Sequence, residues 1–161
     1  MKLSPLLAAI TGALILSLAS GCGLKKDTKA AEAEVDRFHQ RWNADDFKAI
    51  YDEAHANFRN KPAEEATATF RKVKEHYGQF KSGTKKSWGF NTNNGVTSIK
   101  LKYDSVYERA SAVEAFVFRM TGDKALLATY DIMTPETAAK REAEEKAERD
   151  SKKKDAKKPN G

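Results

Sequence analysis

The spacing of the hydrophobic residues changes once along this chain, close to Gly78, and that change limits the folds it can adopt. Before Gly78, apolar residues recur every three or four positions, which is typical of amphipathic helices. After Gly78, apolar and polar residues alternate, which is typical of strands with one buried face. Helices followed by a run of strands predict an α+β fold with an antiparallel sheet.

Three helices are expected before Gly78. Asp45 is expected to cap the second helix, and Pro62 to open the third, which Gly78 ends. The apolar positions of the three helices are, in order, Val35, Phe38 and Trp42; Phe47, Ile50, Tyr51, Ala54 and Phe58; and Ala66, Phe70, Val73 and Tyr77.

Four strands are expected after Gly78. The segments Asn93-Asn94-Gly95 and Gly122-Asp123 have the composition of tight hairpin turns, and Glu108-Arg109 can form another. The apolar positions of the alternating pattern are Trp88 and Phe90; Ile99, Leu101 and Tyr103; Phe116, Phe118 and Met120; and those of the segment from Ala125 to Met133. We expect one curved four-stranded sheet with the N-terminal helices packed on it.

Residues 1–21 have the layout of a secretory signal peptide, which is removed from the mature protein. The apolar run from Leu6 to Ala19 is shorter than the roughly 20 residues that span a bilayer. The only cysteine, Cys22, follows two small residues directly. The sequence Leu18-Ala19-Ser20-Gly21-Cys22 resembles the lipobox of bacterial lipoproteins, although leucine is commoner than Ala19 at its position.

The lipobox resemblance implies that Cys22 receives a diacylglycerol thioether, and that cleavage after Gly21 frees an amino group for acylation by a fatty acid such as palmitate. Gly23 replaces the aspartate associated with retention in the inner membrane. We therefore expect a lipid-anchored protein at the outer membrane, facing the periplasm. An ordinary secretory signal followed by a free thiol is the alternative.

Composition divides the mature chain into a linker at residues 22–29, a domain at 30–133 and a charged, helical or disordered tail at 134–161. The tail has no aromatic residue, and its last eleven residues hold five lysines and one aspartate. This basic end would contact anionic cell-wall or lipid surfaces, or would only keep the chain soluble. Although the chain has a net charge of +6, it carries no nucleic-acid-binding module, so we expect no nucleic-acid partner.

The order of elements, together with three segments, is similar to small bacterial lipoproteins of unknown function with a cystatin-like, nuclear transport factor two-like domain. These segments read DDFKAIYDEAHANF, FRKVKEHYGQF and IKLKYDSVYERASAVEAFVFRMTGDKALLATYDI. The resemblance covers residues 30–133 and implies a cone in which a bent sheet is closed by helices. Enzymes, ligand-binding proteins and interaction modules all use such a pocket, and no catalytic motif accompanies the resemblance.

The predicted turns set a strand register. Glu108-Arg109 as a two-residue loop places Tyr103 opposite Glu114, and Gly122-Asp123 as a loop places Glu114 opposite Asp131. The other pairs are Leu101 with Phe116, Ile99 with Phe118, Phe118 with Leu127 and Phe116 with Thr129. Tyr103, Glu114 and Asp131 would then form one row on the face toward the helices.

This row is the predicted ligand-binding site. Two carboxylates on a buried face raise the pKa of at least one of them, and such shifts point to functional sites. Tyr103, Glu114 and Asp131 would grip a polar group at the mouth of an apolar pocket. Alternatively, the row lies at the open end of the sheet, where Glu114 is hydrated or bonded to Tyr103 or a basic side chain. A one-residue bulge would scatter the row.

The remaining candidates indicate no metal or cofactor. His39, His55 and His76 lie on separate predicted helices without metal-binding spacing, so we expect ordinary solvated or half-buried histidines. We therefore expect a non-catalytic module, anchored to the membrane through Cys22, that binds a small ligand or an envelope protein. The alternative is a small enzyme of the same fold that uses Glu114 or Asp131 as a general base.

Overall fold

A computed structural model describes residues 20–156 of the chain, and it confirms the predicted α+β fold. The predicted signal peptide up to residue 19 and the end of the tail from residue 157 lie outside this range. The elements are α1 (Ser20–Asn43), α2 (Phe47–Asp52), α3 (Ala63–Tyr77), β1 (Phe80–Asn93), β2 (Val96–Tyr107), β3 (Ser111–Thr121), β4 (Lys124–Met133) and α4 (Pro135–Ala156).

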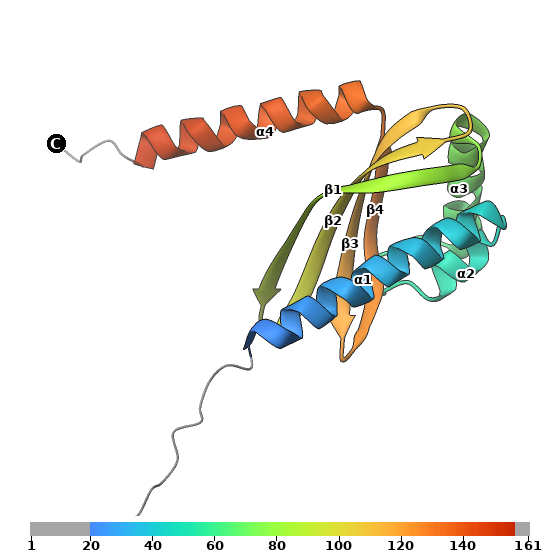
Figure 1. Cartoon of the computed structure of the whole chain (residues 1–161), viewed down its shortest axis with the longest axis horizontal. Coiled ribbons are helices and arrows are strands. Elements are labelled where there is room, and N and C mark those ends of the chain that lie inside the picture. Colours follow the sequence, from blue (N-terminus) through green and yellow to red (C-terminus); the bar gives the residue numbers. More distant parts are fainter. Residues whose placement is uncertain (1–19, 157–161) are drawn as a thin grey trace, which may run out of the picture.

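The four strands form one antiparallel sheet in the order β1-β2-β3-β4, so β1 and β4 are its edges. Each strand joins the next by a tight hairpin. The first turn places Asn94 at φ 50° and Gly95 at φ 76°, left-handed values that asparagine and glycine tolerate. Figure 1 shows α1 crossing one face of the bent sheet, with α2 and α3 at one end of α1.

The core lies between the helices and this face of the sheet. Phe116, at the centre of β3, is fully buried, and its ring meets the Phe38 ring of α1 edge to face at 5.3 Å. The largest other side chains of the core are Val35, Trp42, Phe47, Ile50, Phe70, Tyr77, Ile99, Leu101, Tyr107, Phe118 and Leu127. These are mostly the positions that the two hydrophobic periods predict.

Two helix predictions need correction. Residues 22–29, expected as a linker, belong to the first turns of α1. Asp46, and not Asp45, caps α2 by accepting a hydrogen bond from Ala49 N at 3.2 Å. Asp45 instead has φ 59° and pairs with Lys74 of α3 at 2.7 Å.

The predicted strand register is right for β2 with β3 and wrong for most of β3 with β4. Phe118 faces Leu127 as predicted, but Val117 faces Thr129, so Ala128 is an extra residue in β4. This bulge reverses the faces of the following residues. Glu114 therefore lies opposite Ile132 and Phe116 opposite Tyr130, whereas Asp131 lies on the outer face of the sheet.

The tail begins as a helix that docks on the outer face of the sheet and then leaves it (Figure 1). Ala138 is buried, Glu142 pairs with Lys102 at 3.0 Å, and Arg141 pairs with Asp131 at 2.6 Å. From Ala143 to Lys153 every residue of α4 is exposed. Within residues 20–156, no helix combines the length and the apolar character needed to cross a membrane.

Replacing Phe116 by alanine should lower the free energy of unfolding by about 3 to 5 kcal/mol, because it removes a fully buried ring from the centre of the core. Denaturant unfolding measures the change. Val106→Ala is the control, since Val106 is largely exposed and its loss should cost about 0.5 kcal/mol or less. Equal costs for the two variants would contradict the assignment of the buried face.

Candidate functional site

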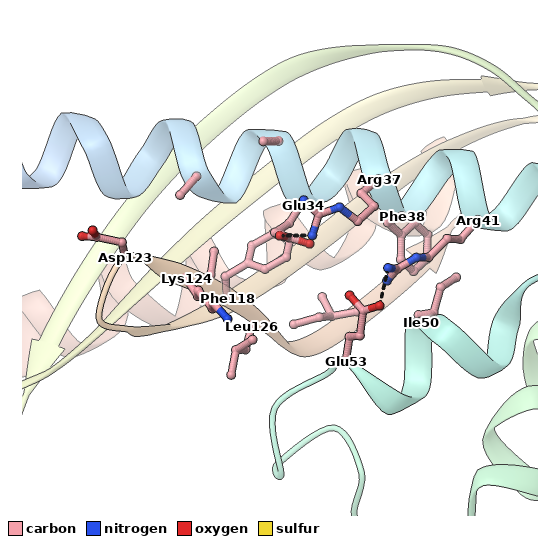
Figure 2. A pocket seen from close by; sticks show the side chains of 14 residues that line it. Glu34, Arg37, Phe38, Arg41, Ile50, Glu53, Phe118, Asp123, Lys124 and Leu126 are labelled. Carbon is pink, nitrogen blue, oxygen red and sulfur yellow. Dashed lines mark hydrogen bonds and ion pairs between the residues drawn. The ribbon is translucent and has the colours of Figure 1, made fainter.

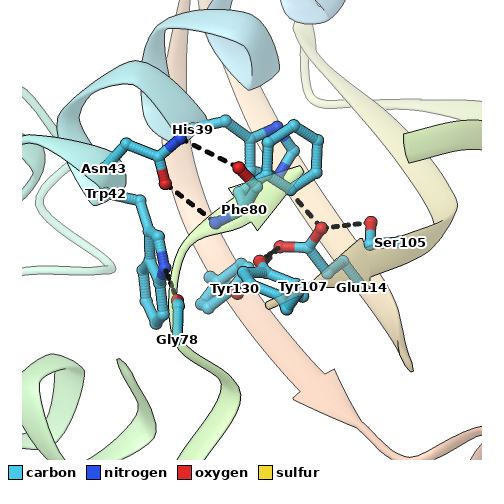
Figure 3. A network of polar contacts seen from close by, with 9 residues as sticks. All are labelled: His39, Trp42, Asn43, Gly78, Phe80, Ser105, Tyr107, Glu114 and Tyr130. Carbon is cyan, nitrogen blue, oxygen red and sulfur yellow. Dashed lines mark hydrogen bonds and ion pairs between the residues drawn. The ribbon is translucent and has the colours of Figure 1, made fainter. Parts of the chain in front are cut away.

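Glu114 is the one carboxylate in the described core, and four side chains donate hydrogen bonds to it (Figure 3). Its Oε2 accepts from His39 Nε2 at 2.9 Å and from the Ser105 hydroxyl. Its Oε1 accepts from the hydroxyls of Tyr107 at 2.7 Å and Tyr130 at 2.9 Å. A carboxylate has about four acceptor positions, so this cluster uses all of them.

The donors of the Glu114 cluster come from three other elements. Ser105 and Tyr107 alternate along β2, on the strand face that also carries Glu114 in β3. Tyr130 reaches this face because of the bulge at Ala128 in β4, and His39 approaches from α1. The cluster thus links one helix to three strands.

The hydrogen bonds outweigh the cost of burying the charge. Burial by itself would raise the pKa of Glu114, but the hydrogen bond and the electrostatic attraction from His39, together with the hydrogen bonds from the Ser105 and Tyr107 hydroxyls, hold this pKa below its usual value. Burial and the Glu114 charge raise the pKa of both Tyr107 and Tyr130. The carboxylate is therefore ionised and the two phenols are neutral at neutral pH.

The end of α1 is held to the start of β1 beside this cluster. The His39 ring stacks on Phe80 at 3.6 Å. The Asn43 amide donates to Phe80 O at 3.0 Å and accepts from Phe80 N at 2.8 Å, and Trp42 Nε1 donates to Gly78 O at 3.0 Å. Gly78 has φ 80°, and a Cβ there would lie 2.9 Å from Glu108 Cβ, so only glycine fits.

The structure does not bring together the predicted trio of Tyr103, Glu114 and Asp131. Tyr103 shares the inner face, but its ring meets Phe116 edge to face, and its hydroxyl is not among the four donors. Burial and the nearby carboxylates raise the pKa of Tyr103 to about 12. Asp131 lies on the outer face with Arg141, so it cannot act with Glu114 as a pair.

Sequence reasoning missed His39, Ser105, Tyr107 and Tyr130 as partners of Glu114. The predicted β2–β3 register already placed Ser105 and Tyr107 on the inner face, so a buried Glu114 there was a signal to look for donors on that strand. Tyr130 was missed because the bulge in β4 moves it to the inner face, whereas strict alternation placed it on the outer face. The cluster is closed on itself, and a ligand would have to replace one of its hydrogen bonds to reach the carboxylate.

An open groove lies on the other side of α1, between α1, α2 and the β3–β4 hairpin (Figure 2). Its volume is about 630 Å³. The floor is apolar and comes from all three parts, with Phe38 of α1, Ile50 of α2, and Phe118 and Leu127 of the hairpin. Grooves with volumes of about 300 to 1,000 Å³ and apolar linings are typical of ligand sites.

Charged side chains surround this floor in two ion pairs (Figure 2). Arg37 pairs with Glu34 at 2.7 Å, one turn apart on α1, and Arg41 pairs with Glu53, the C-cap residue of α2, at 2.5 Å. Burial raises the pKa of Glu34, against the opposing effect of the two arginines. The arginine and glutamate charges balance, so the groove does not select strongly for an anion or a cation.

One wall of the groove is the free edge of β4. Lys124, Ala125, Leu126 and Leu127 line the groove, and no further strand pairs with β4 in the described sheet. The loop after α2 bonds this edge once, where His55 N donates to Leu127 O at 2.8 Å. An edge strand beside an apolar groove can receive a further extended chain.

The three histidines have separate surroundings, with His39 in the core cluster, His55 in the loop after α2 and His76 exposed on α3. Residues 20–156 contain no group of three or more His, Cys, Asp or Glu side chains arranged to hold a metal ion.

Glu114→Gln should reduce the free energy of unfolding at pH 7 by about 1 to 3 kcal/mol, because the amide nitrogen cannot accept hydrogen bonds and leaves buried donors of the cluster unpaired. The pKa of Glu114 is lower in the folded chain than the ordinary value of 4.5. Its contribution is therefore full above about pH 4.5 and is lost as the pH falls through the folded pKa. Denaturant unfolding at pH values from 7 to 3 should show that this variant loses less unfolding free energy on acidification than the wild type.

Glu144→Gln is the matched control for this pH dependence, since Glu144 is exposed on α4. It should retain the wild-type acid profile. A Glu114→Gln profile that runs parallel to the wild type would show that the buried carboxylate does not contribute to acid unfolding.

The comparisons of this chain with known proteins give no family. No protein-family model, curated protein or solved structure matches it. The similarity to cystatin-like lipoproteins stays a prediction.

Proposed function

We propose that this chain is a lipoprotein of the bacterial cell envelope, held by lipid on Cys22 at the periplasmic face of the outer membrane, and that its domain is a non-catalytic binding module. The lipobox-like sequence that ends at Cys22 supports the location. The groove beside α1 supports the binding activity.

The observation that carries the proposed activity is the apolar groove along the free edge of β4. Its backbone edge supplies hydrogen-bonding groups for an extended chain, and its floor supplies an apolar surface for alternate side chains of that chain. The balanced charges of Arg37, Arg41, Glu34 and Glu53 suit a peptide with side chains of both signs. The proposed occupant is an extended segment of another envelope protein.

A small apolar ligand is the second candidate, because the volume of about 630 Å³ suits one. The enzyme alternative has less support. A general base needs a free lone pair within reach of substrate, whereas the four acceptor positions of Glu114 are occupied and Asp131 is paired with Arg141 outside both the cluster and the groove.

Ala33→Trp should abolish peptide binding, because Ala33 lies on the exposed side of α1 at the groove. An indole at this position would fill the part of the groove that the peptide occupies. Peptides are selected from a displayed library by binding to the Cys22→Ser chain. Their affinities for this parent chain and for the same chain with Ala33→Trp are then measured by titration calorimetry. Hydrogen exchange should show that a bound peptide protects the amides of Ala125 and Leu127. Gln40→Trp, two turns further along α1 and outside the groove, is the matched control and should retain binding.

Two outcomes would contradict the peptide proposal. Peptides that bind Ala33→Trp as tightly as the parent chain would place the binding site elsewhere. A small-molecule adduct in native mass spectra of the purified parent chain, lost in Ala33→Trp and not displaced by any selected peptide, would favour the small-ligand candidate.

Cys22→Ser should move the protein from the membrane fraction to the soluble periplasmic fraction, because the serine hydroxyl cannot form the thioether anchor. Fractionation of cells, with metabolic labelling by a fatty acid, measures this change. An unlabelled wild type, or a Cys22→Ser chain that stays in the membrane fraction without labelling, would contradict lipid anchoring at this residue.

A further inference from the structure

An exposed aromatic pair lies on the sheet next to the beginning of α1. Trp88 and Phe90 of β1 are 50 % and 54 % exposed, and their rings stack at 6.4 Å with 21° between their planes. They pair with the buried residues Leu101 and Ile99 of β2, so they belong to the inner face of the sheet. This is a part of the inner face that the helices leave open.

The first turns of α1 add positive charge beside this aromatic pair. Lys25, Lys29 and Trp88 line the same hollow, of about 370 Å³, together with Leu24, Thr28 and Glu32. Glu32 pairs with Lys85 of β1, whereas Lys25 and Lys29 belong to none of the ion pairs within residues 20–156. The hollow therefore carries a net positive charge.

The same end of α1 contains Cys22. Lys25 and Lys29 follow it by three and seven residues, which is about 4.5 and 10.5 Å along a helix. Figure 1 shows the end of β1 close to the start of α1. A lipid anchor at Cys22 would bring both lysines and the aromatic pair to the headgroup region of the bilayer.

We infer that Trp88, Phe90, Lys25 and Lys29 form a membrane-docking face that binds anionic phospholipid in the leaflet holding Cys22. Tryptophan and other aromatic rings favour the membrane interface, and lysines are attracted to anionic headgroups. The inference rests on the proposed lipid anchor. With the anchor in place, docking sets the orientation of α1 on the bilayer, and with it the height of the groove above the membrane.

The test couples the single thiol of residues 22–161 to a maleimide lipid in phosphatidylglycerol vesicles with brominated acyl chains. Chemical coupling supplies the anchor, so the result does not depend on whether cells lipidate Cys22. Trp42 is fully buried and serves as an internal reference. Trp88 emission should shift to shorter wavelength and be quenched by the bromines, and Trp88→Phe should remove the quenched component.

Lys25→Gln with Lys29→Gln should lower the equilibrium constant between the undocked and the docked states about 30-fold, since each lysine near an anionic surface contributes about a five-fold change. Lys152→Gln with Lys153→Gln in α4 is the matched control and should dock like the wild type. Neutral phosphatidylcholine vesicles should weaken docking in the same way as the Lys25 and Lys29 changes.

Three results would overturn the inference. Trp88 emission that stays the same as without vesicles would mean that the face remains in water. Loss of quenching in the Lys152 and Lys153 variant alone would assign membrane contact to the tail. Shielding of Trp88 from acrylamide in a dimer of the Cys22→Ser chain would mean that a second copy covers the face.

Discussion

The structure depends on one buried carboxylate. Removing the Glu114 side chain from water costs several kcal/mol, and the folded chain offsets this cost with an imidazole and three hydroxyls placed on both carboxylate oxygens. The donors come from α1, β2 and β4, so the carboxylate is satisfied only when these elements take their observed positions around β3. Phe38 packs edge to face on Phe116 and adds apolar contact between α1 and the sheet, but such packing tolerates small shifts. The hydrogen bonds to Glu114 do not.

The position of α1 connects the cluster to both proposed surfaces. His39 and Asn43 hold the end of α1 against Glu114 and the start of β1. The helix borders the groove from Ala30 to Arg41, and its beginning lies beside Trp88. A helix that is fixed at one end, anchored to lipid at the other and lined by a groove between them would present that groove at a defined distance from the membrane.

The hydrophobic pattern was sufficient to predict the fold, but it predicted the candidate site only in part. Periods of 3.6 and two residues placed three helices before four strands, and the Glu108-Arg109 turn placed Tyr103 correctly opposite Glu114. The error came from β4, where Leu126, Leu127 and Ala128 interrupt strict alternation and the bulge reverses the later residues. Ile132 therefore lies in the place opposite Glu114 that was expected for Asp131, and Tyr130 in the place opposite Phe116 that was expected for Thr129. The groove was not predicted, because it depends on how α1 and α2 pack beside the edge of the sheet.

The stabilisation of a buried charge on Glu114 is tested most directly by its ionisation in the folded chain, followed through the ¹³C resonance of its side-chain carboxyl as the pH is lowered. Glu114→Gln assigns the resonance. If the four hydrogen bonds stabilise the charge, this carboxyl stays ionised in the folded chain below pH 4.5, the ordinary pKa of glutamate. Uptake of a proton by this carboxyl above pH 4.5 in the folded chain would show that the cluster does not stabilise the charge, because a protonated Glu114 cannot accept from all four donors.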